Sequence, residues 1–290
     1  MAAPEAKHTI ELAGRRLAWR SLGGGPALVL VNGYAATAAD WDPTLLGALA
    51  GSFELICPDN RGVGDSQLGD PGELSIEAMA GDLVLLLDAL GLDEASFVGW
   101  SMGGFVVQGL AALAPARVRR MALLATDPGG PSATLPDAEV WARLTDHSGS
   151  PREQATRLLS LLFPPAVAVP IDRMFGDVVA AARAALSPQA LSAQEHAIDA
   201  WHAREPPAPA LGQPLGPGGT PGSGASPGPG APPVLAVCGS EDIVIPPANL
   251  QALAARWPNA RTEVFAGGGH AFMAQEPERL AAAIADFLEG

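Results

Sequence analysis

The stretch Gly99-Trp100-Ser101-Met102-Gly103 decides how this chain is interpreted. An apolar, strand-like segment at residues 96–98 precedes it, and a helical run at residues 105–113 follows it. A serine between two glycines at this spacing, in a strand–turn–helix context, is typical of a nucleophile carried on a sharp, strained turn. Glycine is needed at both flanking positions because a side chain there would collide with neighbouring backbone. We therefore predict that Ser101 is a nucleophile, against the alternative of a Gly-rich structural turn that happens to contain serine.

The segments around this turn alternate between strand-like and helix-like patterns. Continuous apolar runs, typical of strands buried on both faces of a parallel sheet, occur at residues 27–31, 53–57, 96–98, 118–125 and 234–238. Helical stripes of apolar side chains occur at residues 83–90, 250–257 and 280–288. Residues 8–20 predict an antiparallel hairpin at a sheet edge. The alternation predicts an α/β fold with a mostly parallel central sheet flanked by helices.

Two stretches depart from this alternation. Residues 128–205 are mostly helical in character and predict a helical cap inserted into the α/β core. Residues 206–232 carry Gly or Pro at 17 of 27 positions, a composition that cannot build a packed core and predicts a flexible linker. The predicted organisation is therefore an α/β core made of residues 1–127 and 233–290, with the cap and the linker between its two parts.

Composition narrows the classes of partner and the location. The chain has 17 basic and 31 acidic residues, a net charge of −14, which argues against nucleic acid as a partner because phosphate binding needs clustered Lys and Arg. No apolar run reaches the roughly 18 residues that would predict a membrane span. Polar Glu5, Lys7 and His8 stand where a signal peptide would need its apolar core, so we expect a cytoplasmic protein. Cys57 and Cys238 each end an apolar run, and we expect buried, reduced thiols.

A serine hydroxyl is a weak nucleophile until a base removes its proton. Among the five histidines, only His270 lies in a Gly-rich loop, residues 267–269, between a strand-like segment and the C-terminal helical stripe. In an open α/β sheet, ligands bind beyond the carboxyl ends of the strands, where such loops lie. We therefore predict His270 as the base.

The base needs an acidic partner that orients its ring and stabilises its protonated form. Asp242 follows a predicted strand, and the chain order Ser101, Asp242, His270 is the order of nucleophile, acid and base expected for this architecture. Two alternatives stay open, because Glu241 is adjacent and Asp127 follows another predicted strand near the same edge. We predict Asp242 as the acid.

The oxyanion that forms on attack needs two backbone N–H donors. A predicted strand ends at Val31-Asn32-Gly33-Tyr34, where glycine allows a sharp turn that presents the Tyr34 amide. The Met102 amide, at the start of a predicted helix, is the second expected donor. Side chains that adjoin these positions are predicted to line the substrate pocket: Tyr34, Trp100, Phe272 and Met273.

The chain resembles the α/β-hydrolase superfamily over nearly its whole length, apart from residues 206–232. Besides the serine motif, the segment Asp59-Asn60-Arg61-Gly62-Val63-Gly64-Asp65-Ser66 is similar to the superfamily's D-x-R-G-x-G-x-S segment. The resemblance implies a structural role for that loop, so Asp59 and Arg61 are interpreted as scaffold. Asn32-Gly33 stands where many members carry His-Gly, and members resembling enol-lactonases often have Asn there. A serine nucleophile speaks against the dehalogenase and epoxide-hydrolase branches, which use Asp.

The residues and the resemblance together predict a serine hydrolase of the esterase, enol-lactonase or perhydrolase-like branch. It would cleave a small to medium, largely apolar carboxylic ester or lactone through an acyl-enzyme on Ser101, with a small-molecule substrate, no cofactor and no metal. A perhydrolase or cofactor-free haloperoxidase-like activity and a carbon–carbon bond hydrolase are alternatives, because the fold and the triad do not fix the substrate. From another class, a non-catalytic ligand-binding homologue is a further alternative.

Overall fold

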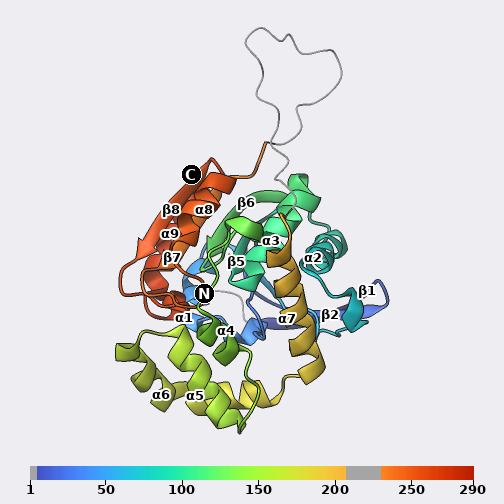
Figure 1. Ribbon diagram of the computed structural model, residues 1–290. Coiled ribbons are helices and arrows are strands. Elements are labelled where there is room, and N and C mark those ends of the chain that lie inside the picture. Colours follow the sequence, from blue (N-terminus) through green and yellow to red (C-terminus); the bar gives the residue numbers. More distant parts are fainter. Residues whose placement is uncertain (1–4, 207–229) are drawn as a thin grey trace, which may run out of the picture.

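A computed structural model describes residues 5–206 and 230–290 of the chain. The described residues form a sheet of eight strands in the order β1-β2-β4-β3-β5-β6-β7-β8 (Figure 1). The strands are β1 (Ala6–Leu12), β2 (Arg15–Gly23), β3 (Ala27–Val31), β4 (Glu54–Pro58), β5 (Ala95–Trp100), β6 (Val118–Leu124), β7 (Val234–Gly239) and β8 (Ala260–Phe265). The pairs β1–β2 and β2–β4 are antiparallel, and every other pair is parallel. The predicted mostly parallel sheet with a hairpin at one edge is confirmed.

Helices cover both faces of this sheet (Figure 1). The helices are α1 (Pro43–Leu49), α2 (Ile76–Leu90), α3 (Met102–Leu113), α4 (Ala138–Leu144), α5 (Pro151–Leu162), α6 (Pro165–Ala184), α7 (Pro188–Ala203), α8 (Asn249–Arg256) and α9 (Pro277–Glu289). Short 3₁₀ turns are η1 (Ala38–Asp40), η2 (Pro71–Glu73), η3 (Pro115–Arg117), η4 (Gly130–Ser132) and η5 (Phe272–Ala274). Helices α1 and α9 pack together, and α2 packs against α3. The α2 helix ends at Gly91, whose φ of +68° is a left-handed cap that glycine adopts without a steric penalty.

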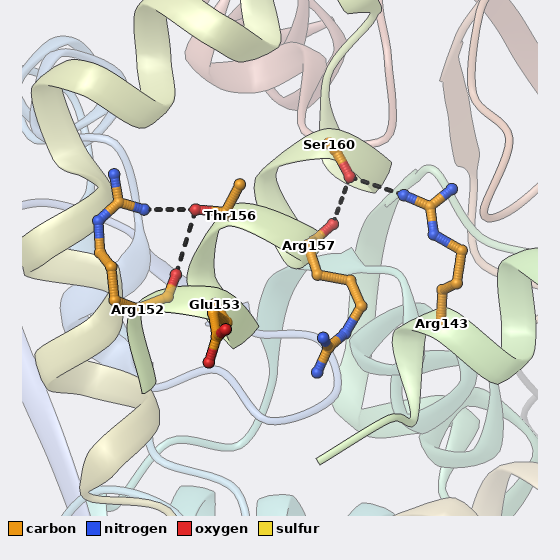
Figure 2. Close-up of a pocket in the computed structure, with 6 residues that line it drawn as sticks. All are labelled: Arg143, Arg152, Glu153, Thr156, Arg157 and Ser160. Atoms are coloured by element: carbon orange, nitrogen blue, oxygen red, sulfur yellow. Dashed lines mark hydrogen bonds between the residues drawn. The ribbon is translucent and has the colours of Figure 1, made fainter. Parts of the chain in front are cut away.

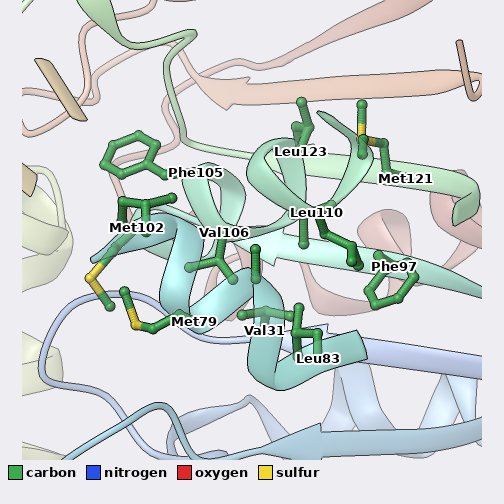
Figure 3. Close-up of a cluster of buried hydrophobic side chains, with 14 of the residues drawn as sticks. Val31, Met79, Leu83, Phe97, Met102, Phe105, Val106, Leu110, Met121 and Leu123 are labelled. Carbon is green, nitrogen blue, oxygen red and sulfur yellow. The ribbon is translucent and has the colours of Figure 1, made fainter. Parts of the chain in front are cut away.

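Successive residues of a parallel strand contribute to different sides of the core. On β3, Val29 and Val31 belong to the buried cluster that contains α2 and α3, whereas Leu28 and Leu30 belong to the cluster that contains α1 and α9. Figure 3 shows side chains of α3 meeting side chains from α2 and from the strands in the first cluster. Burial of each such aliphatic side chain contributes about 1.5–3 kcal/mol. A strand covered on both faces needs apolar residues at every position, which is why these segments show continuous apolar runs.

A helical insertion separates β6 from β7. Helices α4, α5 and α6 lie together beyond one end of the sheet, and α7 returns alongside α3 (Figure 1). The predicted helical cap insertion is thereby confirmed, while its boundaries at residues 128 and 205 stay a prediction. The predicted Gly/Pro-rich linker, residues 206–232, lies almost entirely outside the described residues. Within the described part of the chain, no helix has the length and apolar character needed to cross a membrane.

Candidate active site

Ser101 stands at the turn between β5 and α3. Its backbone has φ +55° and ψ −123°, a conformation that a residue with a Cβ adopts only at an energetic cost. A Cβ at Gly99 would lie 2.6 Å from the Gly103 carbonyl oxygen, and a Cβ at Gly103 would collide with the carbonyl oxygen of Val31. The strained turn and its requirement for two glycines are therefore present as expected.

Three hydrogen bonds hold this turn in place. The Ser101 amide donates to the Leu124 carbonyl at the end of β6 (2.9 Å), and the Ser101 carbonyl accepts from the Gly104 amide (2.8 Å). The Thr126 hydroxyl also donates to the Ser101 carbonyl (2.8 Å). Sequence reasoning missed Thr126, because a threonine after a strand gives no sign of the partner it will meet. The end of β6 thus fixes the nucleophile turn on the neighbouring strand.

Asp242 and His270 form a buried pair beyond the ends of β7 and β8. His270 Nδ1 lies 2.8 Å from Asp242 Oδ2, and the two residues are 2% and 3% exposed, respectively. The other carboxylate oxygen, Oδ1, accepts the amides of Val244 (2.8 Å) and Ile245 (2.9 Å). A carboxylate only accepts hydrogen bonds, so Nδ1 carries the proton and Nε2 of the neutral ring presents its lone pair. This is the tautomer that a general base requires.

Close packing sets the His270 loop against its neighbours. A Cβ at Gly239 would collide with the Gly268 carbonyl oxygen, and the Glu241 amide donates to that same oxygen (2.8 Å). Trp100 Nε1 donates to the His270 carbonyl (3.0 Å), and the two rings lie 5.4 Å apart between centroids. Trp100 therefore links the histidine loop to the nucleophile turn.

The catalytic hydrogen bond between Ser101 and His270 is not formed in the described part of the chain. Among the hydrogen bonds of the described residues, none joins Ser101 Oγ to the His270 ring, whose described partner is Asp242. In unliganded enzymes, bonds of this kind are often long and tighten only when substrate binds. The serine–histidine contact of the predicted triad stays a prediction.

The two rival acids have other surroundings. Asp127 is 1% exposed and pairs with Nε2 of His202 on α7, with its two oxygens at 3.1 and 3.3 Å. It also accepts the Gly129 amide at 2.8 Å. The Glu241 side chain is exposed. Of the three carboxylates weighed from the sequence, Asp242 is the one that contacts His270.

Residues 33–35, here called the oxyanion loop, pass beside the nucleophile. A Cβ at Gly33 would lie 3.2 Å from Ser101 Cβ. Neither the Tyr34 amide nor the Met102 amide donates a hydrogen bond to any other described residue. The Met102 amide directly follows Ser101 in the nucleophile turn, and the Tyr34 amide follows Gly33, which packs against Ser101. Such donors are what an oxyanion on an attacked carbonyl needs.

Asn32 fixes the point where the oxyanion loop leaves β3. Its Oδ1 accepts the Gly33 amide (3.1 Å), and its Nδ2 donates to the Thr37 carbonyl (2.5 Å). Asn60 Nδ2 donates to the Asn32 carbonyl (2.9 Å). The asparagine that stands in place of the more usual histidine therefore closes this loop on itself, and it uses the Gly33 amide while the Tyr34 amide stays free.

The four side chains predicted to line a pocket lie in different surroundings. The Tyr34 hydroxyl reaches the cap and donates to Glu195 Oε1 (2.5 Å), whereas Trp100 packs on the His270 loop as described above. Phe272 is fully buried, and its ring lies 4.8 Å from the ring of Phe265 between centroids. Met273 is buried in the same α1–α9 cluster. A pocket role for these four residues stays a prediction.

The loop after β4 makes contacts of a structural kind. Asp59 accepts the amides of Ala38 (2.8 Å) and Asp65 (3.1 Å), and burial raises the pKa of its carboxyl. Arg61 donates to both carboxylate oxygens of Asp82, at 2.5 and 2.9 Å. Neither Asp59 nor Arg61 bonds to Ser101, Asp242 or His270 in the described part of the chain. These contacts agree with the scaffold role that the resemblance implies.

A cavity of about 400 Å³ opens on the cap, in a region separate from these residues. Its lining residues lie on α4 and α5 (Figure 2): Arg143, Arg152, Glu153, Thr156, Arg157 and Ser160. Arg152 pairs with Asp172 (2.6 Å) and Arg157 with Asp146 (3.4 Å), so carboxylates of the cap already balance much of the positive charge. No group of three or more His, Cys, Asp or Glu side chains in the described ranges is arranged to hold a metal ion.

The chain is similar to known hydrolases over nearly its whole length. The model of the alpha/beta hydrolase family matches residues 28–283. The putative carbamate hydrolase RutD of Caulobacter segnis is 28% identical over 271 residues, which cover 92% of each chain. The structure of a hydrolase from Pseudomonas aeruginosa PA01 superposes with a TM-score of 0.78 at 26% identity, covering 98% of both chains.

The fold is shared more widely. The enol-lactonase of Burkholderia xenovorans LB400 superposes with a TM-score of 0.76 at 24% identity, covering 98% of this chain and 100% of its own. These matches confirm the expected fold and the expectation of a hydrolase. Because the family model matches most of its length, the chain belongs to the alpha/beta hydrolase family.

Proposed function

We propose that this protein is a serine hydrolase that cleaves a small to medium, largely apolar carboxylic ester or lactone through an acyl-enzyme on Ser101. One observation carries the proposal. At the carboxyl ends of the parallel strands, the strained serine turn is linked through Trp100 to the loop that carries the buried Asp242–His270 pair, and the Tyr34 and Met102 amides have no described hydrogen-bond partner. These are the parts that acyl transfer requires.

The proposed reaction has two halves. Ser101 Oγ attacks the carbonyl carbon while His270 Nε2 takes the hydroxyl proton. The oxyanion of the tetrahedral intermediate then accepts hydrogen bonds from the free amides of Tyr34 and Met102. Collapse of this intermediate expels the alkoxide, which receives the proton from His270 and leaves as the alcohol. In a lactone, the alcohol stays attached to the acyl group. Water then gives a proton to His270 and attacks the acyl-enzyme, which releases the acid and restores the serine.

Apolar side chains from the cap and the core support an apolar substrate. The buried cluster that contains Met102 of the nucleophile turn also contains Ile245, which follows the proposed acid. Tyr34 of the oxyanion loop and Trp141 of cap helix α4 pack against the same cluster. The side chains packed beside the nucleophile turn are therefore mostly apolar, which favours a substrate whose acyl group is uncharged.

The experiment that tests the proposal compares Ser101→Ala with the wild-type protein on p-nitrophenyl esters of increasing acyl length. We expect turnover to fall about 10⁶-fold and labelling by a fluorophosphonate probe to vanish, with an unchanged circular dichroism spectrum. Ser52→Ala, at an exposed position, is the matched control and should keep both activities. Retained turnover in Ser101→Ala would remove this serine from the mechanism.

A carbamate is a second candidate substrate, because the relatives named putative carbamate hydrolases span nearly the whole chain. Attack of Ser101 at the carbamate carbonyl would expel the alcohol and leave a carbamoyl-enzyme. Water would release this as a carbamic acid, which decomposes to an amine and carbon dioxide. Measuring kcat/KM for matched p-nitrophenyl esters and carbamates decides between them. Peracid formation from acetate and hydrogen peroxide, assayed in parallel, tests the perhydrolase alternative. An assay for cleavage of a carbon–carbon bond tests the remaining enzymatic alternative, a carbon–carbon bond hydrolase.

A further inference from the structure

Gln194 of cap helix α7 reaches into the core and bonds the oxyanion loop. Its side chain is fully buried, and its Oε1 accepts the Ala35 amide at 2.9 Å. Its Nε2 donates to the Arg61 carbonyl at 3.0 Å, so both ends of the amide group are satisfied. A buried glutamine with all its partners on the other side of an interface makes a specific contact, because misplacing it would leave several polar groups unpaired.

The loop at this point has an unfavourable backbone conformation. Ala35 has a φ of +58°, a left-handed conformation that is uncommon for a residue with a Cβ. Conformations of this kind persist only where the surroundings hold them. The Gln194 side chain is the group that bonds the Ala35 amide, so it stabilises the turn that follows Tyr34.

The next residue of the same helix, Glu195, holds the Tyr34 side chain. The Tyr34 hydroxyl donates to Glu195 Oε1 at 2.5 Å, and His147 Nε2 lies 2.7 Å from the same oxygen. Burial, together with the Glu195 carboxylate, raises the pKa of Tyr34, so the phenol stays protonated and remains a donor. The Tyr34 ring is thus turned toward the cap while its amide remains free.

The core holds this loop at its start and just beyond its end. Asn32 bonds Gly33 and the Thr37 carbonyl, and the Ala36 amide donates to the Gly33 carbonyl at 3.4 Å. In the middle, Ala35 has Gln194 of α7 as its side-chain partner, and the Tyr34 hydroxyl has Glu195 of α7 and, at 3.4 Å, His147 Nε2 between α4 and α5. The cap therefore completes a structure that the core begins.

We propose that Gln194 and Glu195 are positioning residues for the oxyanion hole, a role that rests on the proposed function of the Tyr34 amide as an oxyanion donor. They hold the oxyanion loop in the turn that directs this amide at the developing charge. Since both lie on α7, the seating of the cap and the stabilisation of the transition state are linked. A cap that shifts away from the core would release the loop and weaken the oxyanion hole without any change at Ser101.

The main test is Gln194→Met, which keeps the volume of the side chain and removes both hydrogen bonds. Losing an oxyanion donor outright costs about 10²–10³ in kcat. Misplacing one should cost about 10- to 100-fold, with KM changed less than about twofold. Affinity for an alkyl boronic acid, which forms a tetrahedral adduct with the serine, should fall by a similar factor. Gln189→Met, exposed on the same helix, is the matched control and should change neither quantity.

A second variant, Tyr34→Phe, tests the proposal even if Gln194→Met does not fold. Tyr34→Phe removes the hydroxyl and keeps the ring and the backbone amide, and we expect a loss of about 3- to 10-fold in both kcat and boronic acid affinity. Combined with Glu195→Ala, the loss should be smaller than the product of the two single losses, because both remove the same bond. Asp199→Ala, exposed on α7, controls for general effects on the helix.

The outcomes separate this proposal from the proposed function. If Ser101→Ala is inactive while Gln194→Met and Tyr34→Phe keep the wild-type kcat and boronic acid affinity, the positioning role is wrong and the serine mechanism stands. A lower melting temperature with unchanged kcat would likewise assign these residues to packing alone. If Ser101→Ala keeps its activity, the proposed function fails first, and the positioning role fails with it.

Discussion

Aspartate–histidine pairs stand after two neighbouring strands, β6 and β7. After β7, Asp242 meets His270 at 2.8 Å, and after β6, Asp127 meets His202 at 3.1 Å. Both aspartates are buried, and each lies three positions after the last residue of its strand, which is Leu124 in β6 and Gly239 in β7. The histidines differ in origin. His270 belongs to a core loop held by Trp100, whereas His202 lies near the end of cap helix α7.

The two pairs also use opposite nitrogens of the imidazole ring. His270 turns Nδ1 to its carboxylate and leaves Nε2 free, whereas His202 turns Nε2 to both oxygens of Asp127. The His202 ring packs edge-on against Phe105 of α3, with centroids 5.4 Å apart. We interpret the Asp127–His202 pair as an attachment of the cap to the core. A strand-end aspartate can thus take either role, and the element that supplies its histidine decides which.

The largest expected effect separates the two histidines. His270→Ala should lower kcat by about 10⁶-fold, because removal of the base costs about as much as removal of the whole catalytic unit. His202→Ala should lower kcat less than about tenfold, because its ring bonds Asp127 and packs on α3. Steady-state turnover of a p-nitrophenyl ester measures both. Comparable losses in the two variants would end the distinction between the pairs.

The next effect concerns the two acids. Asp242→Asn should lower kcat about 10⁴-fold, because an amide that donates to Nδ1 favours the wrong tautomer of His270. Its Oδ1 can still accept the amides of Val244 and Ile245, so the loop should keep its shape. Asp127→Asn is the matched control, with a much smaller loss in kcat. If the control were the damaging change, the acid would be Asp127.

The same two substitutions should rank in the opposite order when the stability of the cap is measured instead of kcat. Asp127→Asn removes the charge that pairs with His202, and we expect the free energy of unfolding to fall by about 1–3 kcal/mol. Amides of α7 should then exchange faster with deuterium, because the end of the helix loses its contact with the core. Asp242→Asn should leave exchange in α7 unchanged. Urea denaturation and peptide-level hydrogen exchange measure the two quantities, and protection of α7 that is equal in both variants would contradict the attachment role.

Much of the fold could be predicted because strands buried on both faces demand continuous apolar runs. The run at residues 27–31 coincides with β3. The run at residues 96–98 was too short, since β5 extends through Gly99 and Trp100, which pair with β6. Glycine is unfavourable in strands, so the sequence pattern predicts a strand end before Gly99. The pairing of Gly99 and Trp100 with β6 extends the strand by these two residues.

The contacts of the candidate site also fall into those that the sequence predicts and those that it does not. The Asp242–His270 contact followed from chain order and from loops at strand ends, which are local features of the sequence. The contacts between the cap and the core gave no such signal. Ala35 and Gln194 are 159 positions apart, and a single buried glutamine on an amphipathic helix looks like any other polar residue until the packing is known.

The smallest expected effect uses Cys238, which lies on β7 shortly before Asp242. Burial raises the pKa of the Cys238 thiol to about 11, and the Asp242 carboxylate adds to the shift because it disfavours a second negative charge nearby. Asp242→Asn removes that charge, so the thiol pKa should fall slightly, whereas Asp127→Asn should leave it unchanged. The pH dependence of iodoacetamide labelling measures this in a Cys57→Ala background, which removes the other buried thiol. An equal shift in both variants would mean that the two carboxylates act on β7 alike, and that the electrostatic part of the distinction between the pairs is wrong.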